Sequence, residues 1–294
     1  MLADAHLPSI SVVIPSYNQG HLIEETLISV LGQQYPRLEV IVIDGGSNDS
    51  SVEVLRRYAG QLTYWHSQPD QGQADAINLG MRRSSGQILC WLNSDDMFLP
   101  GTLLDAGRRL APQIDRPALL YGDALTIHQG SGTLAGGAQS AGSFDATRLT
   151  YSDYLVQPST FWTRRLWQAT GELNVAYRYV LDWDWFIRAS QHAAFCRVER
   201  HYAIYRAHPD HKTGNGADAR RSEIYQVVRR YASSYWQRLY HATLGCYPQV
   251  RQLLNWLIAH RVPKPTLFLL LRFPQLLRRL RRPHDLHTVL QMYG

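Results

Sequence analysis

The first third of the chain alternates short apolar runs with stretches of helical periodicity, and this alternation limits the fold more than any other feature. The apolar runs are short enough to be buried strands, while the stretches between them have apolar residues three and four apart. The predicted strands are 10–14, 38–43, 62–65 and 87–92, and the predicted helices are 21–36, 52–58 and 73–83. This pattern is typical of βαβ units, so we expect an α/β fold whose central, mostly parallel sheet is flanked by helices.

The pattern changes after Leu120. Residues 130–142 are small and glycine-rich, which predicts a mobile loop. From about Asp218 the apolar residues return with helical spacing. We therefore expect an α/β domain over residues 1–215 and a helical, basic C-terminal extension over residues 216–294.

The net charge of +6 comes largely from arginines late in the chain. In residues 261–284 these arginines alternate with leucines and phenylalanines, which favours peripheral contact with an anionic membrane surface and argues against nucleic acid as a partner. The alternative is that this face packs on its own domain, and both interpretations stay open.

Three distant cysteines without CxxC spacing predict reduced thiols rather than a disulfide framework or a zinc site. The N-terminus lacks the pattern of a signal peptide, and no uncharged apolar run is long enough to span a membrane. These features predict a cytoplasmic protein, and the basic tail would place it at the inner face of the cytoplasmic membrane.

Polar residues follow each predicted strand, where parallel sheets bind ligands. The first strand ends in Pro15, followed by Tyr17 and Asn18: the tyrosine could stack on a base, and the asparagine could equally cap the next helix. The second strand runs into Asp44 and Gly45. A carboxylate there can accept hydrogen bonds from a base or ribose, and the glycine allows close backbone approach.

The fourth strand runs into Asn93-Ser94-Asp95-Asp96. Adjacent carboxylates repel each other unless a cation is present. Hard oxygen ligands with a diphosphate suit Mg²⁺ or Mn²⁺, so we expect a metal at Asp96 and Asp95. An acidic turn before a helix is the alternative explanation of this segment.

Two later segments also carry candidate residues. In Leu181-Asp182-Trp183-Asp184-Trp185, a carboxylate between bulky aromatic rings would be a good proton acceptor, or the pair could belong to the first turn of a helix. In the segment from Tyr205 to Lys212, the two histidines His208 and His211 could bind metal or phosphate, or be solvated.

The order and spacing of these segments resemble the family 2 glycosyltransferases of the inverting, bacterial polysaccharide type, which have the Rossmann-like GT-A fold. The resemblance covers about residues 9 to 212. It is carried by SVVIPSYNQG, VIDGGSNDSS, QPDQGQADAIN, ILCWLNSDD, QPSTFW, LDWDWFIR and YRAH.

The resemblance implies a role for each matching position. Asp44 would hydrogen-bond the base, and Asp75 would line the donor pocket. Asp95 would lie near the ribose, Asp96 would bind the metal, and His208 would close over the diphosphate. The remaining residues assigned to the nucleotide-sugar pocket are Pro15, Tyr17, Asn18, Gly45 and Asn93.

The position of Asp182 implies the catalytic base. The family usually has glutamate before this aspartate, whereas this chain has Leu181, so Asp184 is kept as the second candidate. Asp182 would take the proton from an acceptor hydroxyl in a single inverting displacement, while the metal stabilises the departing diphosphate. The loop 130–142 would fold over the donor and exclude water.

These features predict an enzyme that moves a sugar from a nucleotide-diphosphate donor, with UDP favoured, to a glycan or lipid-linked acceptor in cell-surface polysaccharide synthesis. A nucleotidyl- or phosphoryl-transfer enzyme would need a phosphate loop such as GxxxxGK[ST], which the sequence lacks. The other alternative is a catalytically inactive module of the same fold that acts as a scaffold at a membrane, and only Leu181 favours it.

Overall fold

The computed structural model describes residues 7–128, 134–138, 143–208, 216–260 and 281–293. The chain divides into two compact units. The first unit consists of Met1–Phe144 and Tyr154–His211, and the second of Asp145–Asp153 and Lys212–Gly294. The predicted division into an α/β domain over residues 1–215 and a helical extension over residues 216–294 remains a proposal.

The first unit is built on one sheet, which has nine strands among the described residues. Eight of them follow the order β3-β2-β1-β4-β8-β6-β9-β5, and β7 pairs with β6 outside this path. The strands are β1 (Ile10–Ser16), β2 (Leu38–Asp44), β3 (Tyr64–Ser67), β4 (Ile88–Trp91), β5 (Met97–Phe98), β6 (Leu119–His128), β7 (Leu134–Ala138), β8 (Thr160–Thr163) and β9 (Phe195–Ala207).

The half of the sheet from β3 to β4 is parallel throughout, as predicted. In the other half β8 runs antiparallel to both β4 and β6, while β9 runs parallel to β6. The predicted α/β fold with a mostly parallel sheet is confirmed. Because β1, β2, β3 and β4 all point the same way, the residues that follow them emerge at one edge of the sheet.

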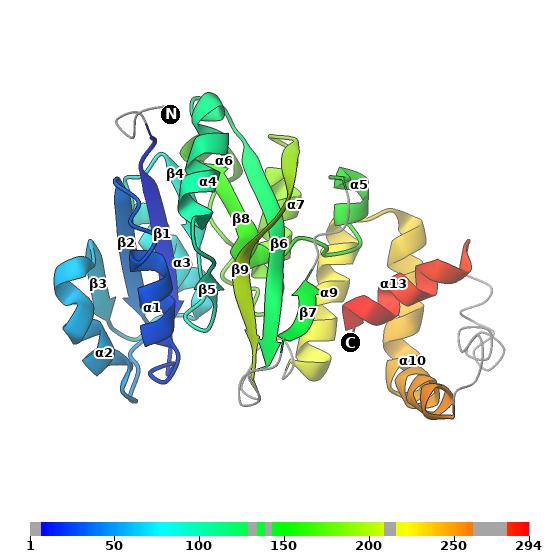
Figure 1. Ribbon diagram of the computed structural model, residues 1–294. Coiled ribbons are helices and arrows are strands. Elements are labelled where there is room, and N and C mark those ends of the chain that lie inside the picture. Colours follow the sequence, from blue (N-terminus) through cyan, green and yellow to red (C-terminus); the bar gives the residue numbers. More distant parts are fainter. Residues whose placement is uncertain (1–6, 129–133, 139–142, 209–215, 261–280, 294) are drawn as a thin grey trace. The chain divides into compact units, whose positions relative to one another are not determined.

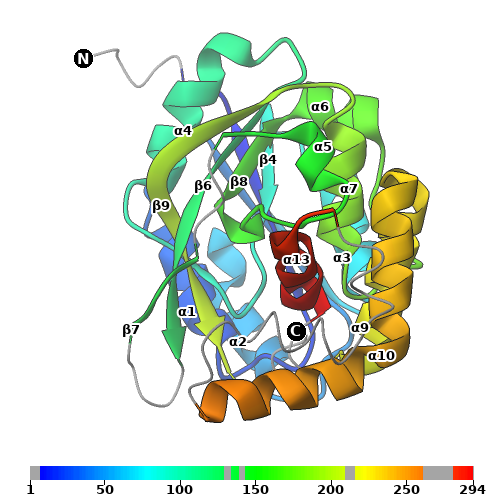
Figure 2. The same ribbon diagram turned by 90° about the vertical axis from the view of Figure 1, so that its right-hand side faces the viewer.

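Helices cover both faces of this sheet (Figures 1 and 2). One face carries α1 (Ile23–Leu31), α2 (Ser51–Tyr58) and α4 (Thr102–Leu110), and the other carries α3 (Gln73–Arg83), α6 (Arg164–Thr170) and α7 (Leu181–Ala189). Short 3₁₀ turns lie at Ala59–Gln61, Ala111–Gln113 and Gln157–Ser159. All seven residues of β1 are buried, as its β-branched run between two helical layers requires.

Aromatic side chains attach α7 to the sheet. Trp91 of β4 and Trp162 of β8 meet edge to face with ring centroids 5.3 Å apart, and Trp185 of α7 lies 4.8 Å from Trp162. Trp183 and Phe186 of the same helix are also fully buried. Large aromatic rings that pack together in this way contribute strongly to a core, so the first turn of α7 has a well-determined position.

The segment predicted as a mobile glycine-rich loop is partly a strand. Residues Leu134–Ala138 form β7, which pairs antiparallel with β6 from Ala124 to Ile127. Backbone hydrogen bonds to an existing strand outweigh the low strand propensity of the glycines. The rest of 130–142 lies outside the described residues, and closure over the donor stays an untested prediction.

The second unit is helical and has its own core. It contains α5 (Ala146–Leu149), α9 (Ala217–Tyr231), α10 (Ser234–Ala259) and α13 (Pro283–Tyr293). Tyr235 donates its hydroxyl proton to Asp285, and Tyr293 donates to the carbonyl of Tyr240 at 3.1 Å. Leu286 and Val289 of α13 are buried. The end of the predicted membrane tail therefore packs internally, while 261–280 lie outside the described residues.

Across the part of the chain that the structure describes, no helix is long and apolar enough to cross a membrane.

Candidate functional site

The carboxylate of Asp44 ends β2 and is fully buried. Its Oδ2 accepts hydrogen bonds from the backbone N–H of Ser47 at 2.8 Å and from the Ser67 hydroxyl at 2.6 Å, while its Oδ1 accepts the Ser47 hydroxyl at 2.5 Å. Asp44 thus joins the turn after β2 to the end of β3. A side chain that is buried and bonded on both oxygens fixes the shape of this edge and has little surface left for a ligand.

The loop after β1 is fastened to the turn after β2. Asn18 has a left-handed backbone (φ 52°), its N–H donates to the Ser47 hydroxyl at 2.8 Å, and its side-chain oxygen accepts the N–H of Asn48 at 3.0 Å. Asn18 therefore braces the two loops. Pro15 is buried within β1, whereas Tyr17 is 62% exposed at the strand end and can meet a ligand there.

A second buried carboxylate, Asp96, follows β4 and is only 1% exposed. The backbone N–H of Arg206 in β9 donates to its Oδ1 at 3.2 Å, and Asn93 Nδ2 lies 3.4 Å from its Oδ2. Burial raises the pKa of Asp96 well above its usual range, and the neighbouring Asp95 carboxylate adds to this, against the lowering effect of Arg206. Asp96 is therefore a buried carboxylate whose two oxygens are held by Arg206 and Asn93.

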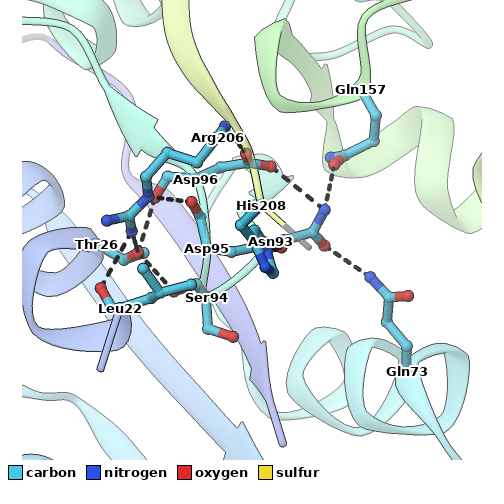
Figure 3. Close-up of polar contacts among 10 residues, drawn as sticks. All are labelled: Leu22, Thr26, Gln73, Asn93, Ser94, Asp95, Asp96, Gln157, Arg206 and His208. Atoms are coloured by element: carbon cyan, nitrogen blue, oxygen red, sulfur yellow. Dashed lines mark hydrogen bonds and ion pairs between the residues drawn. The ribbon is translucent and has the colours of Figure 1, made fainter. Parts of the chain in front are cut away.

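The Arg206 side chain is itself buried and gathers the β4 loop and α1 around one cation (Figure 3). Its guanidinium donates to the carbonyl of Asp95, to the carbonyl of Leu22 at 3.1 Å, to the hydroxyl of Thr26 at 3.1 Å and to the Glu25 carboxylate. Burial lowers the pKa of Arg206, which stays a cation at neutral pH.

Thr26 of α1 completes the attachment of this loop. Its hydroxyl is 2.8 Å from the carbonyl of Ser94 and 2.8 Å from that of Asp96. The loop after β4 is therefore fixed by α1 on one side and by β9 on the other.

Asp95 lies beside His208, which follows β9 (Figure 3). The distance from His208 Nε2 to Asp95 Oδ2 is 3.1 Å, and the Asp95 side chain keeps 18% of its surface exposed. The structure thus brings together two residues that are more than one hundred positions apart and that the sequence assigned to the same ligand.

The donor set around Asp95 fits a divalent metal. A carboxylate and an imidazole are ligands that Mn²⁺ accepts. The 3.1 Å separation here is that of a direct hydrogen bond. It also allows both atoms to occupy adjacent positions on an octahedral ion, since donors about 2.1 Å from such an ion are about 3 Å apart. Among the described residues no group of three His, Cys, Asp or Glu side chains could hold an ion by itself, so the remaining ligands would come from a diphosphate and water.

Two glutamines extend the hydrogen bonds of Asn93, and one of them, Gln157, is buried. Gln73, the first residue of α3, donates to Asn93 Oδ1 at 2.7 Å. Asn93 Nδ2 lies 3.5 Å from Gln157 Oε1, and Gln157 donates in turn to the carbonyl of Trp91 at 3.0 Å. These contacts link Asn93, which the resemblance assigned to the nucleotide-sugar pocket, to α3 and to the 3₁₀ turn at Gln157–Ser159 (Figure 3).

Asp75 lies in the first turn of α3 and accepts the N–H of Gln71 at 3.2 Å. Close to it is Asp70, which sequence reasoning did not single out. Asp70 Oδ1 accepts the N–H of Gly72 at 2.7 Å, and its carboxylate lies against Gly45. The end of β3 therefore adds a carboxylate to the edge where Asp44 and Gly45 were predicted to act.

The two aspartates of α7 differ in their surroundings. Asp184 is 1% exposed, and Arg188 donates to its Oδ2 at 2.9 Å while also holding the carbonyls of Thr170 and Glu172. Asp182 is only partly buried, and its Oδ1 accepts the N–H of Trp183 at 2.8 Å. Arg188, which is held by Asp184, connects α7 to the end of α6. Asp182 is therefore the better candidate for contact with an acceptor.

Comparison with known structures identifies the fold. Staphylococcus aureus TarS in complex with UDP-GlcNAc aligns with a TM-score of 0.62 at 17% identity, covering 97% of this chain and 91% of that one. The mannosyltransferase PcManGT from Pyrobaculum calidifontis, in complex with GDP-Man and Mn²⁺, aligns with a TM-score of 0.61 at 19% identity, covering 99% and 86%. The architecture is thus that of the GT-A glycosyltransferases.

Sequence comparison identifies the family. The profile described as Glycosyl transferase family 2 matches residues 11–156. A PGL/p-HBAD biosynthesis glycosyltransferase of Mycobacterium tuberculosis is 28% identical over 200 residues, which are 67% of this chain and 75% of that protein. An uncharacterized glycosyltransferase of the same species is 42% identical over 92 residues, which are 31% of this chain and 35% of that protein. The chain belongs to glycosyl transferase family 2.

Several residues of the site escaped prediction: Gln73, Asp70, Gln157 and Arg206. The segments that contain them were recognised, but nothing in the sequence shows that Arg206 is buried while Tyr205 is only partly buried. A signal was available in QPDQG, where a carboxylate follows a predicted strand as it does at Asp44. His211 and the rest of 209–215 lie outside the described residues.

Proposed function

We propose that this glycosyltransferase moves a sugar from a nucleotide-diphosphate donor to an acceptor hydroxyl with inversion at the anomeric carbon. The observation that carries the proposal is the loop after β4, where buried Arg206 fixes the backbone and Asp95 lies 3.1 Å from His208. A donor with a diphosphate supplies the negative charge that such a site can bind through a cation. The complexes of TarS with UDP-GlcNAc and of PcManGT with GDP-Man support a donor of this class.

Asp95 and His208 would hold Mn²⁺ or Mg²⁺, and Asp96 would support them from within the core. This division differs from the role that the resemblance implied for Asp96, because both oxygens of that carboxylate already have donors, the Arg206 N–H and Asn93 Nδ2. When bound, the ion would neutralise the charge that develops on the leaving diphosphate. The Mn²⁺ in the PcManGT complex supports this choice of metal.

Asp182 would act as the base. An acceptor oxygen attacks the anomeric carbon as the bond from that carbon to the diphosphate oxygen breaks, and the acceptor proton passes to the Asp182 carboxylate. One displacement needs one base and inverts the configuration. The buried core of tryptophans holds the first turn of α7, which keeps this carboxylate in a defined place.

The biological substrates are proposed more broadly. We favour UDP as the nucleotide, a glycan or lipid-linked acceptor, and a role in cell-surface polysaccharide synthesis. The basic, leucine-rich stretch 261–282 would contact an anionic membrane surface, which would hold the enzyme near such acceptors. Binding of the intact protein to anionic vesicles that persists after Arg272, Arg278 and Arg279 are all changed to Gln would contradict this contact.

Calorimetry with UDP, GDP and dTDP, with and without Mn²⁺, tests the donor site. We expect metal-dependent binding of at least one nucleotide, weakened about 10-fold or more in Asp95→Asn, because this change removes a charged ligand. Asp115→Asn changes the charge equally on an exposed turn and should leave binding unchanged. Metal-independent binding, equal in both variants, would contradict the site.

Turnover separates the two aspartates of α7. Asp182→Asn should lower the rate about 100-fold or more with an unchanged unfolding temperature, since general base catalysis commonly contributes this much. Asp184→Asn should instead lower the unfolding temperature, because Arg188 loses its charged partner. A large rate loss from Asp184→Asn in a protein of unchanged stability would transfer the base role to that residue.

The alternative is a catalytically inactive scaffold with the same fold, which Leu181 favours because the related enzymes usually have glutamate there. A folded protein that binds no nucleotide with either metal would support the scaffold and overturn the proposed enzyme.

A further inference from the structure

The edge of the sheet that would receive the nucleotide base has two carboxylates that differ in accessibility. Asp44, at the end of β2, is fully buried and accepts three hydrogen bonds from Ser47 and Ser67. Asp70, which follows β3, is only partly buried. Of the two, Asp70 is the carboxylate that retains surface for a ligand.

The position of Asp70 explains the glycine beside it. A Cβ placed on Gly45 would lie 3.0 Å from Asp70 Oδ2 and 3.1 Å from its Oδ1. Those separations are too short for ordinary contact, so the Asp70 carboxylate occupies the volume that a side chain at position 45 would need. The loop after β3 therefore places a carboxylate beside Gly45 at the end of β2.

The electrostatic environment of Asp70 favours a hydrogen-bond donor as ligand. Burial raises the pKa of Asp70, and the carboxylates of Asp75 and Asp44 add to this, against the hydrogen bond from the Gly72 N–H. An N–H group of a ligand would stabilise the ionised form. Nearby, the buried hydroxyl of Ser16, opposite Asp44 in the β1–β2 register, has no partner among the described residues, and buried hydroxyls normally have one.

The separation between Asp70 and the predicted metal ligand Asp95 is compatible with the length of a nucleotide. Asp70 follows β3 and Asp95 follows β4, and these strands are separated by β2 and β1. Three strand intervals correspond to about 14 Å between the strand axes. The base and the diphosphate lie at opposite ends of a nucleotide, so a donor whose phosphates lie at Asp95 can reach Asp70 with its base.

We propose that Asp70, and not Asp44, recognises the nucleotide base, and that it selects a base whose ring nitrogen at the pairing edge carries a hydrogen over one whose ring nitrogen does not. Uracil, thymine and guanine carry such an N–H, whereas cytosine has an unprotonated ring nitrogen there, which an ionised carboxylate disfavours because it only accepts hydrogen bonds. This inference rests on the proposed function and narrows its donor to sugars on uracil, thymine or guanine nucleotides. Asp44 is a positioning residue that fixes the strand ends around the base.

The test is calorimetric titration of the full chain with UDP, dTDP, GDP and CDP in the presence of Mn²⁺. In the unchanged protein, one of the first three should bind about 10-fold or more tightly than CDP, the ratio expected for one charged hydrogen bond. Asp70→Asn should reduce this preference to about threefold or less, because an amide can donate to cytosine. Inorganic pyrophosphate should compete with nucleotide equally well in the unchanged protein and in Asp70→Asn, because it has no base.

Two further variants separate the explanations. Glu53→Gln makes the same change of charge on the exposed side of α2 and should keep the preference. Asp44→Asn should weaken all four nucleotides by similar factors. Nucleotide binding with undiminished selectivity in Asp70→Asn, or loss of selectivity in Asp44→Asn alone, would overturn this assignment while leaving the proposed function intact. Absence of any nucleotide binding by the folded, unchanged protein would overturn both.

Discussion

Asp44 and Asp96 are both buried carboxylates at the ends of parallel strands, yet the structure stabilises them in different ways. Asp44 accepts hydrogen bonds from two serines, Ser47 and Ser67, which lie within 23 positions of it. Asp96 depends on Arg206, which is 110 positions away and belongs to β9. The same local pattern of a strand followed by an aspartate thus gives one carboxylate whose partners are nearby in the sequence and one whose partner is a distant arginine.

The difference affects how each site can fail. Serine hydroxyls are neutral, so losing one leaves a modest deficit of hydrogen bonds. Arg206 is a buried cation with partners in α1 and in the β4 loop, so losing it leaves buried groups without their partner. The β4 end should therefore be the more fragile of the two, and substitutions on each side can test this.

The largest effect is expected from Arg206→Met. The variant should lower the free energy of unfolding by about 3–5 kcal/mol, because it removes one side of a buried ionic arrangement. Urea denaturation measures this. Arg57→Met is the matched control, since Arg57 pairs with Glu24 at the surface with 59% of its own side chain exposed, and should cost about 1 kcal/mol or less. Equal losses of unfolding free energy in Arg206→Met and Arg57→Met would contradict the special importance of the buried arginine.

Asp44→Ala should have the next largest effect. It leaves the Ser47 N–H and two hydroxyls without their acceptor, so the free energy of unfolding should fall by about 1–3 kcal/mol. The same urea series measures it. A loss as large as that of Arg206→Met would mean that the two strand ends are equally dependent on their carboxylates.

Glu25→Gln should have the smallest effect. Glu25 contacts Arg206 but its side chain is 63% exposed, so solvent screens the pair and the cost should be about 1 kcal/mol or less. A loss of several kcal/mol would show that Arg206 depends on this surface partner rather than on the carbonyls of Leu22 and Asp95.

Much of the fold was predictable because its signals are local. The run from Ile10 to Ile14 is apolar on both faces of the strand, and the helix predicted at 73–83 has the bounds of α3. The parallel half of the sheet follows from the βαβ alternation. The strand β7 was not predictable, because glycines and alanines form a strand there only by pairing with β6.

The candidate site was predictable to the extent that strand ends meet at one edge. The predicted residues Asn93, Asp95, Asp96 and His208 do come together. The difference in burial between Asp95 and Asp96 was not predictable, because adjacent aspartates look alike in a sequence. Which of them is buried depends on where Arg206 enters from β9.

The sequence by itself determined the α/β alternation, the family and the segments that carry polar chemistry, because apolar periodicity and short motifs are properties of neighbouring residues. Only the tertiary structure decided which carboxylates stay partly accessible: Asp70 rather than Asp44, Asp95 rather than Asp96, Asp182 rather than Asp184. The physical reason is that burial and hydrogen bonding depend on partners brought in from other elements, and those partners determine whether a carboxylate stabilises the fold or meets a ligand.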